Sequence, residues 1–177
     1  MVDGTSHMFI TGPEVIKTVT NEDVSFDDLG GASTHEKKSG VAHFVASDDS
    51  DALEIVRDLV GRLPSNNLER PPKLIPNDSE DRICQSLDSI VPEDPSIPYD
   101  MLDVIEEVFD VESFLEVQPE FAMNMVVGFA RLGGESVGVI ANQPKVLAGC
   151  LDIDASVKAA RFVRFCDAFG IPLVTFT

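Results

Sequence analysis

The sequence predicts an α/β fold, and three features indicate it. Two apolar runs, residues 124–132 and 135–142, flank Gly133-Gly134, which is the pattern of a β-hairpin. A helical pattern follows over residues 154–169, and residues 172–177 form another strand-like run. Strand, helix and strand in that order predict a βαβ unit with parallel strands. Hydrophobic residues make up 44% of the chain, enough to bury a core.

The N-terminal part is predicted to mix short strands and helices. Residues 8–11 and 41–46 are strand-like. Pro13 suits the first turn of a helix, because proline fits a position whose N–H has no helical partner. A second short helix is predicted to begin near Ser25 and to end at Gly30-Gly31.

A longer helix is predicted over residues 47–63, before Pro64. Ser47 is expected to cap it, with acidic residues in the first turn, where the helix dipole favours negative charge. Its apolar residues recur at helical spacing: Ala52, Leu53, Val56, Leu59, Val60 and Leu63.

Residues 64–98 differ from the rest, since they hold seven of the 11 prolines. Their weak apolar periodicity predicts a linker or a long surface excursion that divides the chain in two. Beyond it, Asp100 is expected to cap a helix. Residues 114–118 read as a strand that precedes the hairpin.

The helix at residues 154–169 is predicted to be capped by Asp154 or Ser156 and to stop at Gly170. Its predicted buried stripe consists of Ala159, Phe162, Val163, Cys166 and Phe169. The sequence then stops inside a strand, which would leave an open edge. We therefore expect an internal piece of a longer polypeptide.

Charge and cysteine content exclude several classes of protein. With 31 acidic and 13 basic residues the formal charge is −18, which argues against a nucleic-acid or anionic-membrane surface. No apolar run approaches the roughly 20 residues of a membrane helix. Three cysteines without a CxxC pair, and no secretory signal pattern, favour a cytoplasmic protein without disulfides. The acid excess fits either an ordinary solvated surface or adaptation to high salt.

Two catalytic motifs are incomplete. Residues 134–138 match GxSxG, but a hairpin precedes Ser136 and a strand follows it, whereas a hydrolase elbow needs a strand and then a helix. His35-Glu36 lacks the second histidine of HExxH, because position 39 is serine. Gly30-Gly31-Ala32 either presents backbone N–H groups to an anion or simply stops a helix.

Several long blocks together resemble one protein family. These are residues 8–44, LPSNN at 63–67, PYDM at 98–101, residues 126–144, and residues 148–176. They resemble the carboxyltransferase β subunits of biotin-dependent acyl-CoA carboxylases, with the greatest likeness to propionyl-CoA (methylmalonyl-CoA-forming) carboxylases. The resemblance runs along nearly the whole chain and is weakest at residues 70–92.

The resemblance implies a crotonase-like (ClpP/crotonase) fold, a superhelix of ββα units in two domains. Residues 1–67 would end the first domain, residues 68–97 form the linker, and residues 98–177 begin the second domain. It also implies a homo-oligomer, a hexamer built as a trimer of face-to-face dimers, and a biotin carboxylase and biotin carrier as partners. The active site would lie between the first domain of one subunit and the second domain of another.

The implied reaction moves CO2 from carboxybiotin to the α-carbon of an acyl-CoA through an enolate. Released biotin would accept the α-proton, and backbone N–H groups in two oxyanion holes would stabilise the enolate, so there is little need for a side-chain acid or base. Both holes are expected outside this sequence, so we predict no catalytic residue and no metal ligand here, with biotin as cofactor and acyl-CoA as substrate. Gly30, Gly31 and Ala32, in an LGGAxTH block, are expected to line the acyl-CoA and biotin cleft.

Alternatives within and outside the family stay open. A methylmalonyl-CoA decarboxylase or a transcarboxylase subunit would share the same blocks. A non-catalytic interaction module of crotonase fold is the alternative from another class. Arg161 and Arg164 are expected to be solvent-exposed, with contact to acyl-CoA phosphates or another subunit as the alternative. The acyl-CoA itself and the identity of the carrier are left open.

Overall fold

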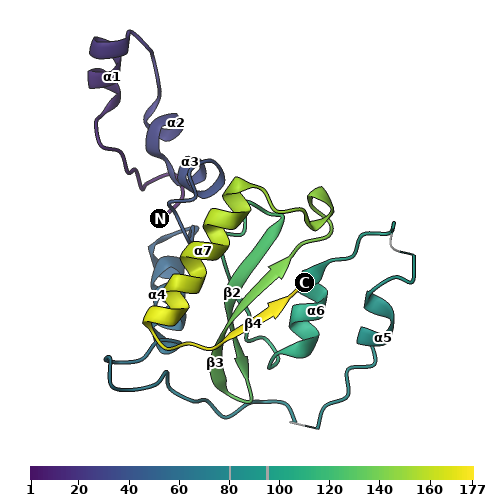
Figure 1. Ribbon diagram of the computed structural model, residues 1–177. Helices are drawn as coiled ribbons and strands as arrows, with labels where there is room; N and C mark the ends of the chain where they lie inside the picture. The colour runs from purple at the N-terminus through teal and green to yellow at the C-terminus, as the bar shows by residue number, and fades with distance from the viewer. Residues whose placement is uncertain (80, 95) are drawn as a thin grey trace. The chain divides into compact units, whose positions relative to one another are not determined.

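The computed structural model describes residues 1–79, 81–94 and 96–177. The chain forms two compact units, Met1–Leu59 and Val60–Thr177 (Figure 1). The predicted domain limits at residues 67 and 98 concern the whole subunit and stay a prediction. Glu80 and Pro95, both in the predicted linker, lie outside the described residues.

The first unit is built from short helices: α1 (Pro13–Thr20), α2 (Phe26–Gly30), α3 (Ala32–Lys37) and α4 (Asp49–Gly61), the last of which continues into the second unit. Pro13 opens α1 as predicted. Ser25 caps α2, because its hydroxyl oxygen accepts the N–H of Asp28 at 3.0 Å. The glycine pair ends α2 as predicted, but α3 begins directly after it and was not foreseen.

The predicted strands at residues 8–11 and 41–46 are wrong. Within the described residues, this unit contains only isolated bridges, Val2 with Ala46 and His7 with Gly31. The backbone hydrogen bonds of these segments go to loops and turns: Met8 N–H donates to Gly30 O, and Ala46 N–H donates to Met1 O. Apolar alternation was present, but no neighbouring strand was available to form a ladder.

The predicted cap of α4 is one residue off. Asp48 Oδ1 accepts the N–H groups of Ser50 and Asp51 at 2.8 and 2.9 Å, which is the role expected of Ser47. The Ser47 hydroxyl instead donates to the carboxylate of Asp51. A carboxylate at the positive end of the helix dipole is the stronger acceptor.

The second unit is organised around a four-stranded sheet in the order β1-β2-β3-β4. The strands are β1 (Leu115–Val117), β2 (Met125–Leu132), β3 (Glu135–Asn142) and β4 (Leu173–Phe176). β2 and β3 pair antiparallel across the predicted turn, and β3 pairs parallel with β4. Helix α7 (Ile153–Ala168) joins these two strands, which confirms both the hairpin and the βαβ unit.

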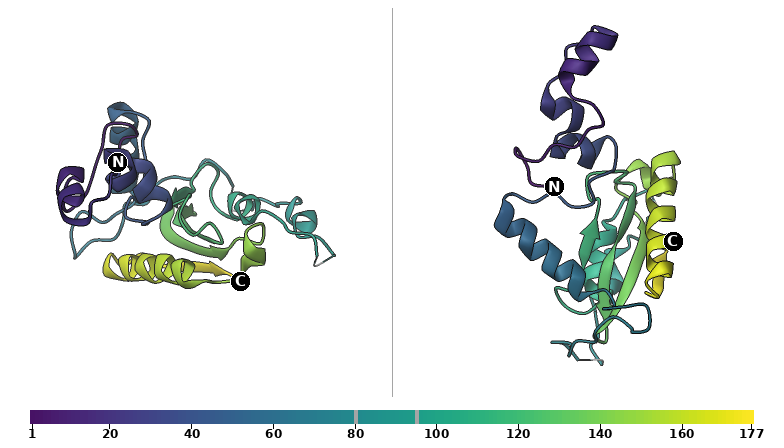
Figure 2. Two further views of the ribbon diagram at one scale, coloured as in Figure 1. Left: turned by 90° about the horizontal axis from the view of Figure 1, so that it is seen from above. Right: turned by 90° about the vertical axis from the view of Figure 1, so that its left-hand side faces the viewer.

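Helices cover both faces of this sheet, as Figures 1 and 2 show. Helix α6 (Met101–Val108), capped by Asp100 as predicted, packs Ile105 against Val126, Val139 and neighbouring apolar residues on one face. Helix α7 packs on the other face. Gly138 makes that approach possible, because a Cβ there would lie 2.7 Å from Cys166 Sγ. The remaining helical turns are α5 (Leu87–Ile90) and η1 (Leu147–Gly149).

The buried face of α7 differs from the predicted stripe. Its fully buried residues are Ala155, Lys158, Phe162 and Cys166, whereas Val163 and Phe169 remain more than a third exposed. Asp152, rather than Asp154 or Ser156, caps the helix by accepting the N–H of Ala155 at 2.8 Å. The helix therefore starts earlier, and a lysine lies on its inner face. Apolar periodicity alone could not indicate a buried lysine.

Lys158 ties α7 to the β1–β2 connection. Lys158 is only 1% exposed, and its ammonium group donates to Gln118 O at 2.8 Å and to Phe121 O at 2.7 Å. Burial lowers the pKa of Lys158 to about 8, although the nearby Glu116 carboxylate opposes that shift. The connection needs this support, since Gln118 and Ala122 both have positive φ.

Within the described residues, no helix is both long enough and apolar enough to cross a bilayer.

Replacing Lys158 with methionine is expected to lower the free energy of unfolding by about 2 kcal/mol, because two buried carbonyls lose their donor.

The pH dependence gives a second test. The pKa of Lys158 is about 8 in the folded protein, and in the unfolded chain it returns to the ordinary value of 10.5. Between pH 8 and pH 10.5 the unfolded chain therefore binds more protons than the folded protein. Wild-type stability should therefore gain about 2 kcal/mol relative to Lys158→Met from pH 7.5 to 10.

Urea unfolding at both pH values measures the two effects. Lys38→Met, a change at an exposed lysine, is the control and should follow the wild type. If wild type and Lys158→Met showed the same pH dependence of stability, the lowered pKa of Lys158 would be contradicted.

Candidate functional site

The predicted site residues Gly30, Gly31 and Ala32 form the turn between α2 and α3, and all three are buried. Gly30 O accepts the N–H of Met8 at 2.8 Å. The Gly31 N–H donates to Asp27 O at 2.9 Å and so closes the end of α2. The turn thus places three small residues beneath the crossing segment at residues 7–9.

Glycine is required here for space. A Cβ at Gly30 would lie 2.3 Å from Met8 O, and one at Gly31 would lie 2.8 Å from Asp27 O. The φ of Gly31 is −70°, which any residue adopts, so close approach rather than backbone conformation selects glycine. The backbone of Met8 can therefore pass directly over the turn.

The side chains that follow the glycines hold the turn in place. His35 Nε2 lies 2.5 Å from Met8 O; because a carbonyl only accepts, this nitrogen carries the proton. His35 Nδ1 contacts the hydroxyl of Ser39 at 2.8 Å. Thr34 Oγ1 donates to Asp27 O at 3.0 Å, and His7 pairs with the Asp27 carboxylate at 2.7 Å. The LGGAxTH block is thus tied to Met8, Asp27 and Ser39 on either side of it in the chain.

The glycine pair was predicted either to present backbone N–H groups to an anion or to stop a helix, and its geometry favours the second role. The Gly31 N–H is already bonded within α2, and α3 has only six residues, so the turn performs the helix-stopping role. Its predicted place in the lining of an acyl-CoA and biotin cleft stays a prediction.

An apolar cavity of about 290 Å³ lies in the same unit and shares Met8 with the turn. Its lining comes from three parts of the unit: Met1 and Met8, residues 41–44 and 46, and the α4 residues Ala52, Ile55, Val56 and Leu59. Such a lining suits an apolar group rather than a charged one. Sequence analysis did not identify this cavity, because residues 41–46 were assigned to a strand.

In the second unit, two of the family-like blocks meet at a polar network. Gln143 Nε2 donates to Asp100 Oδ1 at 2.7 Å, and Lys145 Nζ pairs with Asp100 Oδ2 at 2.9 Å. Burial raises the pKa of Asp100, but hydrogen bonds from Lys145, Gln143 and the Leu102 N–H outweigh it and hold that pKa below its ordinary value. The contact joins the start of α6 to the loop after β3.

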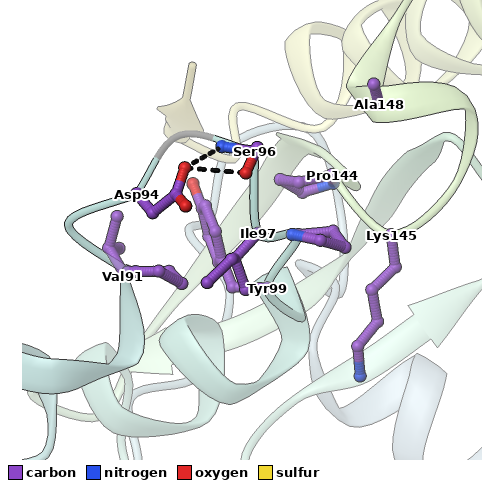
Figure 3. Close-up of a pocket in the computed structure, with 10 residues that line it drawn as sticks. Val91, Asp94, Ser96, Ile97, Tyr99, Pro144, Lys145 and Ala148 are labelled. Atoms are coloured by element: carbon purple, nitrogen blue, oxygen red, sulfur yellow. Dashed lines mark hydrogen bonds between the residues drawn. The ribbon is translucent and has the colours of Figure 1, made fainter.

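A pocket of about 520 Å³ lies beside this network (Figure 3). The side chains of Ile97, Tyr99 and Pro144 line it, and Lys145 stands at its side. Asp94 accepts both the N–H and the hydroxyl of Ser96, which fixes one rim. Sequence analysis missed this pocket because its two sides are more than 40 residues apart.

Within residues 1–79, 81–94 and 96–177, no group of three His, Cys, Asp or Glu side chains is placed to hold a metal ion. Burial raises the pKa of Cys166 to about 12, so its thiol stays protonated and unreactive. Arg161 and Arg164 are exposed on α7.

Comparison with known proteins gives one consistent result. Residues 1–177 match the family described as the carboxyl transferase domain. The chain is 57% identical over 176 residues to the carboxyltransferase subunit of propionyl-CoA carboxylase from Haloferax mediterranei, covering 99% of this chain and 34% of that protein. It is 54% identical to methylmalonyl-CoA decarboxylase subunit alpha from Veillonella parvula, covering 99% of this chain and 35% of that protein.

A solved structure agrees with these relatives. The transcarboxylase 12S hexamer, with methylmalonyl-coenzyme A and methylmalonic acid bound, superposes with a TM-score of 0.95 at 50% identity. The match covers 100% of this chain and 34% of that one. The predicted crotonase-like carboxyltransferase fold is therefore confirmed, and the chain spans about a third of the length of its relatives.

Replacing Gly30 with alanine is expected to destabilise the first unit by about 2 kcal/mol, because the new Cβ collides with the Met8 carbonyl. Gly61→Ala is the matched control: a Cβ at Gly61 meets nothing within 4 Å, and alanine favours the helix. Thermal unfolding of both variants measures the change in stability, which should be negative for Gly30→Ala and zero or positive for Gly61→Ala. Equal stability of the two variants would contradict the packing role of Gly30.

Proposed function

The chain belongs to the carboxyl transferase domain family, and from this we propose that it is a segment of the carboxyltransferase subunit of a biotin-dependent acyl-CoA carboxylase. The proposed reaction transfers CO2 to the α-carbon of propionyl-CoA, or a similar acyl-CoA, through an enolate. The single observation that carries the proposal is the family match over all 177 residues. The 57% identity to a propionyl-CoA carboxylase subunit supports this substrate class.

This segment would contribute main-chain geometry rather than an acid or base. Gly30, Gly31 and Ala32 would line the acyl-CoA and biotin cleft, with His35 and Thr34 holding their backbone. A fixed backbone suits a reaction whose enolate is stabilised by N–H donors. The oxyanion holes themselves are proposed to lie elsewhere in the longer subunit, so no catalytic residue is assigned here.

Biotin would be the cofactor, bound to a carrier protein rather than to this chain. When bound, carboxybiotin supplies the CO2 that is transferred. The buried glycine turn lies among main-chain atoms and has no charged side chain in its three residues, which suits a neutral ureido ring. Partners would be a biotin carboxylase and a biotin carrier, with a homo-oligomer that is a hexamer of three face-to-face dimers; the hexameric transcarboxylase 12S supports this state.

We also propose the division into a first-domain end at residues 1–67, a linker at residues 68–97 and a second-domain start at residues 98–177. The relatives are about three times as long, in keeping with a segment that spans two domains. Three free cysteines, Cys84, Cys150 and Cys166, support a reducing location such as the cytoplasm.

Two related activities compete with this proposal. The 54% identity to a methylmalonyl-CoA decarboxylase subunit favours decarboxylation, and the superposition on transcarboxylase 12S favours a transcarboxylase subunit. A non-catalytic module of this fold is the alternative from another class.

An assay of the longer subunit separates these functions. It is mixed with biotin carboxylase, biotin carrier, ATP and radioactive bicarbonate, and propionyl-CoA is added. The proposal predicts ATP-dependent, acid-stable label on the acyl-CoA, with the 177-residue chain alone inactive as the control. Release of CO2 from methylmalonyl-CoA without labelling would replace the proposal with a decarboxylase, and inactivity in both assays would overturn it.

A further inference from the structure

The segment that follows α4, residues 62–78, lies along the turn end of the sheet, and we call it the strap (Figure 1). Most of it lies in the region at residues 64–98 that was predicted to be a linker or a long surface excursion. Three independent sets of contacts tie it to the sheet and to α6, all within the second compact unit.

Arg131 makes the first set of contacts. This β2 residue is only 8% exposed, and its Nη1 donates to Pro72 O and to Gly134 O, each at 3.0 Å. Its Nη2 donates to Gly61 O at 3.0 Å. One planar guanidinium therefore joins both ends of residues 61–72 to the β2–β3 turn, a geometry that its fixed fork of donors allows.

Gly134 makes the second set. Its carbonyl also accepts the N–H of Leu74 at 3.1 Å, and a Cβ at Gly134 would lie only 1.8 Å from Leu74 O. Beside it, Lys73 pairs with Glu135 at 3.3 Å. The strap therefore lies directly against the main chain of the turn, closer than any residue but glycine allows.

Arg62 and Arg82 complete the attachment near the two ends of the strap. Arg62, 5% exposed, donates to Ser113 O at 2.6 Å. Arg82 donates to the carbonyls of Glu107 and Phe109 and pairs with Asp78 at 3.3 Å. In a chain with 31 acidic residues, arginines placed on main-chain carbonyls serve to hold segments rather than to balance surface charge.

We propose that the strap is a fixed structural element rather than a flexible tether, and that Arg131 is the positioning residue that clasps it to the Gly133–Gly134 turn. A buried guanidinium is tolerated only where its donors are satisfied, and here three carbonyls from separate parts of the chain satisfy them. The path of the strap is thus set by the sheet of the same unit. This inference rests on the contacts above and stands apart from the proposed function.

Trypsin cleavage of the Lys73–Leu74 bond in the full chain tests the proposal, because a bound strap must detach before a protease can cut it. Arg131→Met removes the clasp, and Gly134→Ala places a Cβ against Leu74 O. Both variants should be cleaved there about tenfold faster than wild type or more. Gly133→Ala is the matched control: it has positive φ in the same turn, yet a Cβ there meets nothing within 4 Å.

Amide exchange of β2 and β3 is measured in parallel, so that a folding defect is recognised. Protected strands with fast cleavage in Gly134→Ala, but not in Gly133→Ala, would support the strap. Two results would overturn it: equal cleavage of the two glycine variants, or wild-type cleavage as fast as that of an unstructured peptide. Neither result depends on carboxyl transfer, so the proposed function can fail or stand separately.

Discussion

The second compact unit depends on the backbone of one turn, Gly133-Gly134. Both glycines have positive φ, and both of their N–H groups are held by the carboxylate of Asp110 at 2.7–2.8 Å. That contact joins the turn to the segment after α6, while the Gly134 carbonyl accepts Arg131 and Leu74. The turn thus fixes the register of β2 with β3. Through the same atoms it also fixes the path of the strap.

Main-chain atoms carry the important contacts throughout the molecule. Lys158 donates to two carbonyls, Arg131 to three, and Gly30 lets the Met8 backbone pass over it. The buried cations fix segments to one another, since a desolvated charge holds only a geometry that satisfies its donors. The proposed reaction, in which backbone N–H groups would stabilise an enolate, would need such rigidity in the scaffold.

Sequence reasoning succeeded where local chemistry decides the structure. The hairpin, the βαβ unit and the Pro13 and Asp100 helix starts follow from residues close together in the chain. It failed where distant partners decide: residues 8–11 and 41–46 have strand composition but no ladder, and Lys158 lies on the inner face of α7 because the Gln118 and Phe121 carbonyls are there. The resemblance indicated the LGGAxTH block, but not the spatial reason for Gly30, which depends on Met8, more than 20 residues earlier.

The central proposal is that Gly30, Gly31 and Ala32 line the acyl-CoA and biotin cleft of a carboxyltransferase. Hydrogen exchange of the longer subunit, with and without propionyl-CoA, tests it most directly. The account predicts slower exchange of the peptide over residues 27–36 when the acyl-CoA is bound. Unchanged exchange over those residues, with protection appearing elsewhere in the subunit, would contradict it.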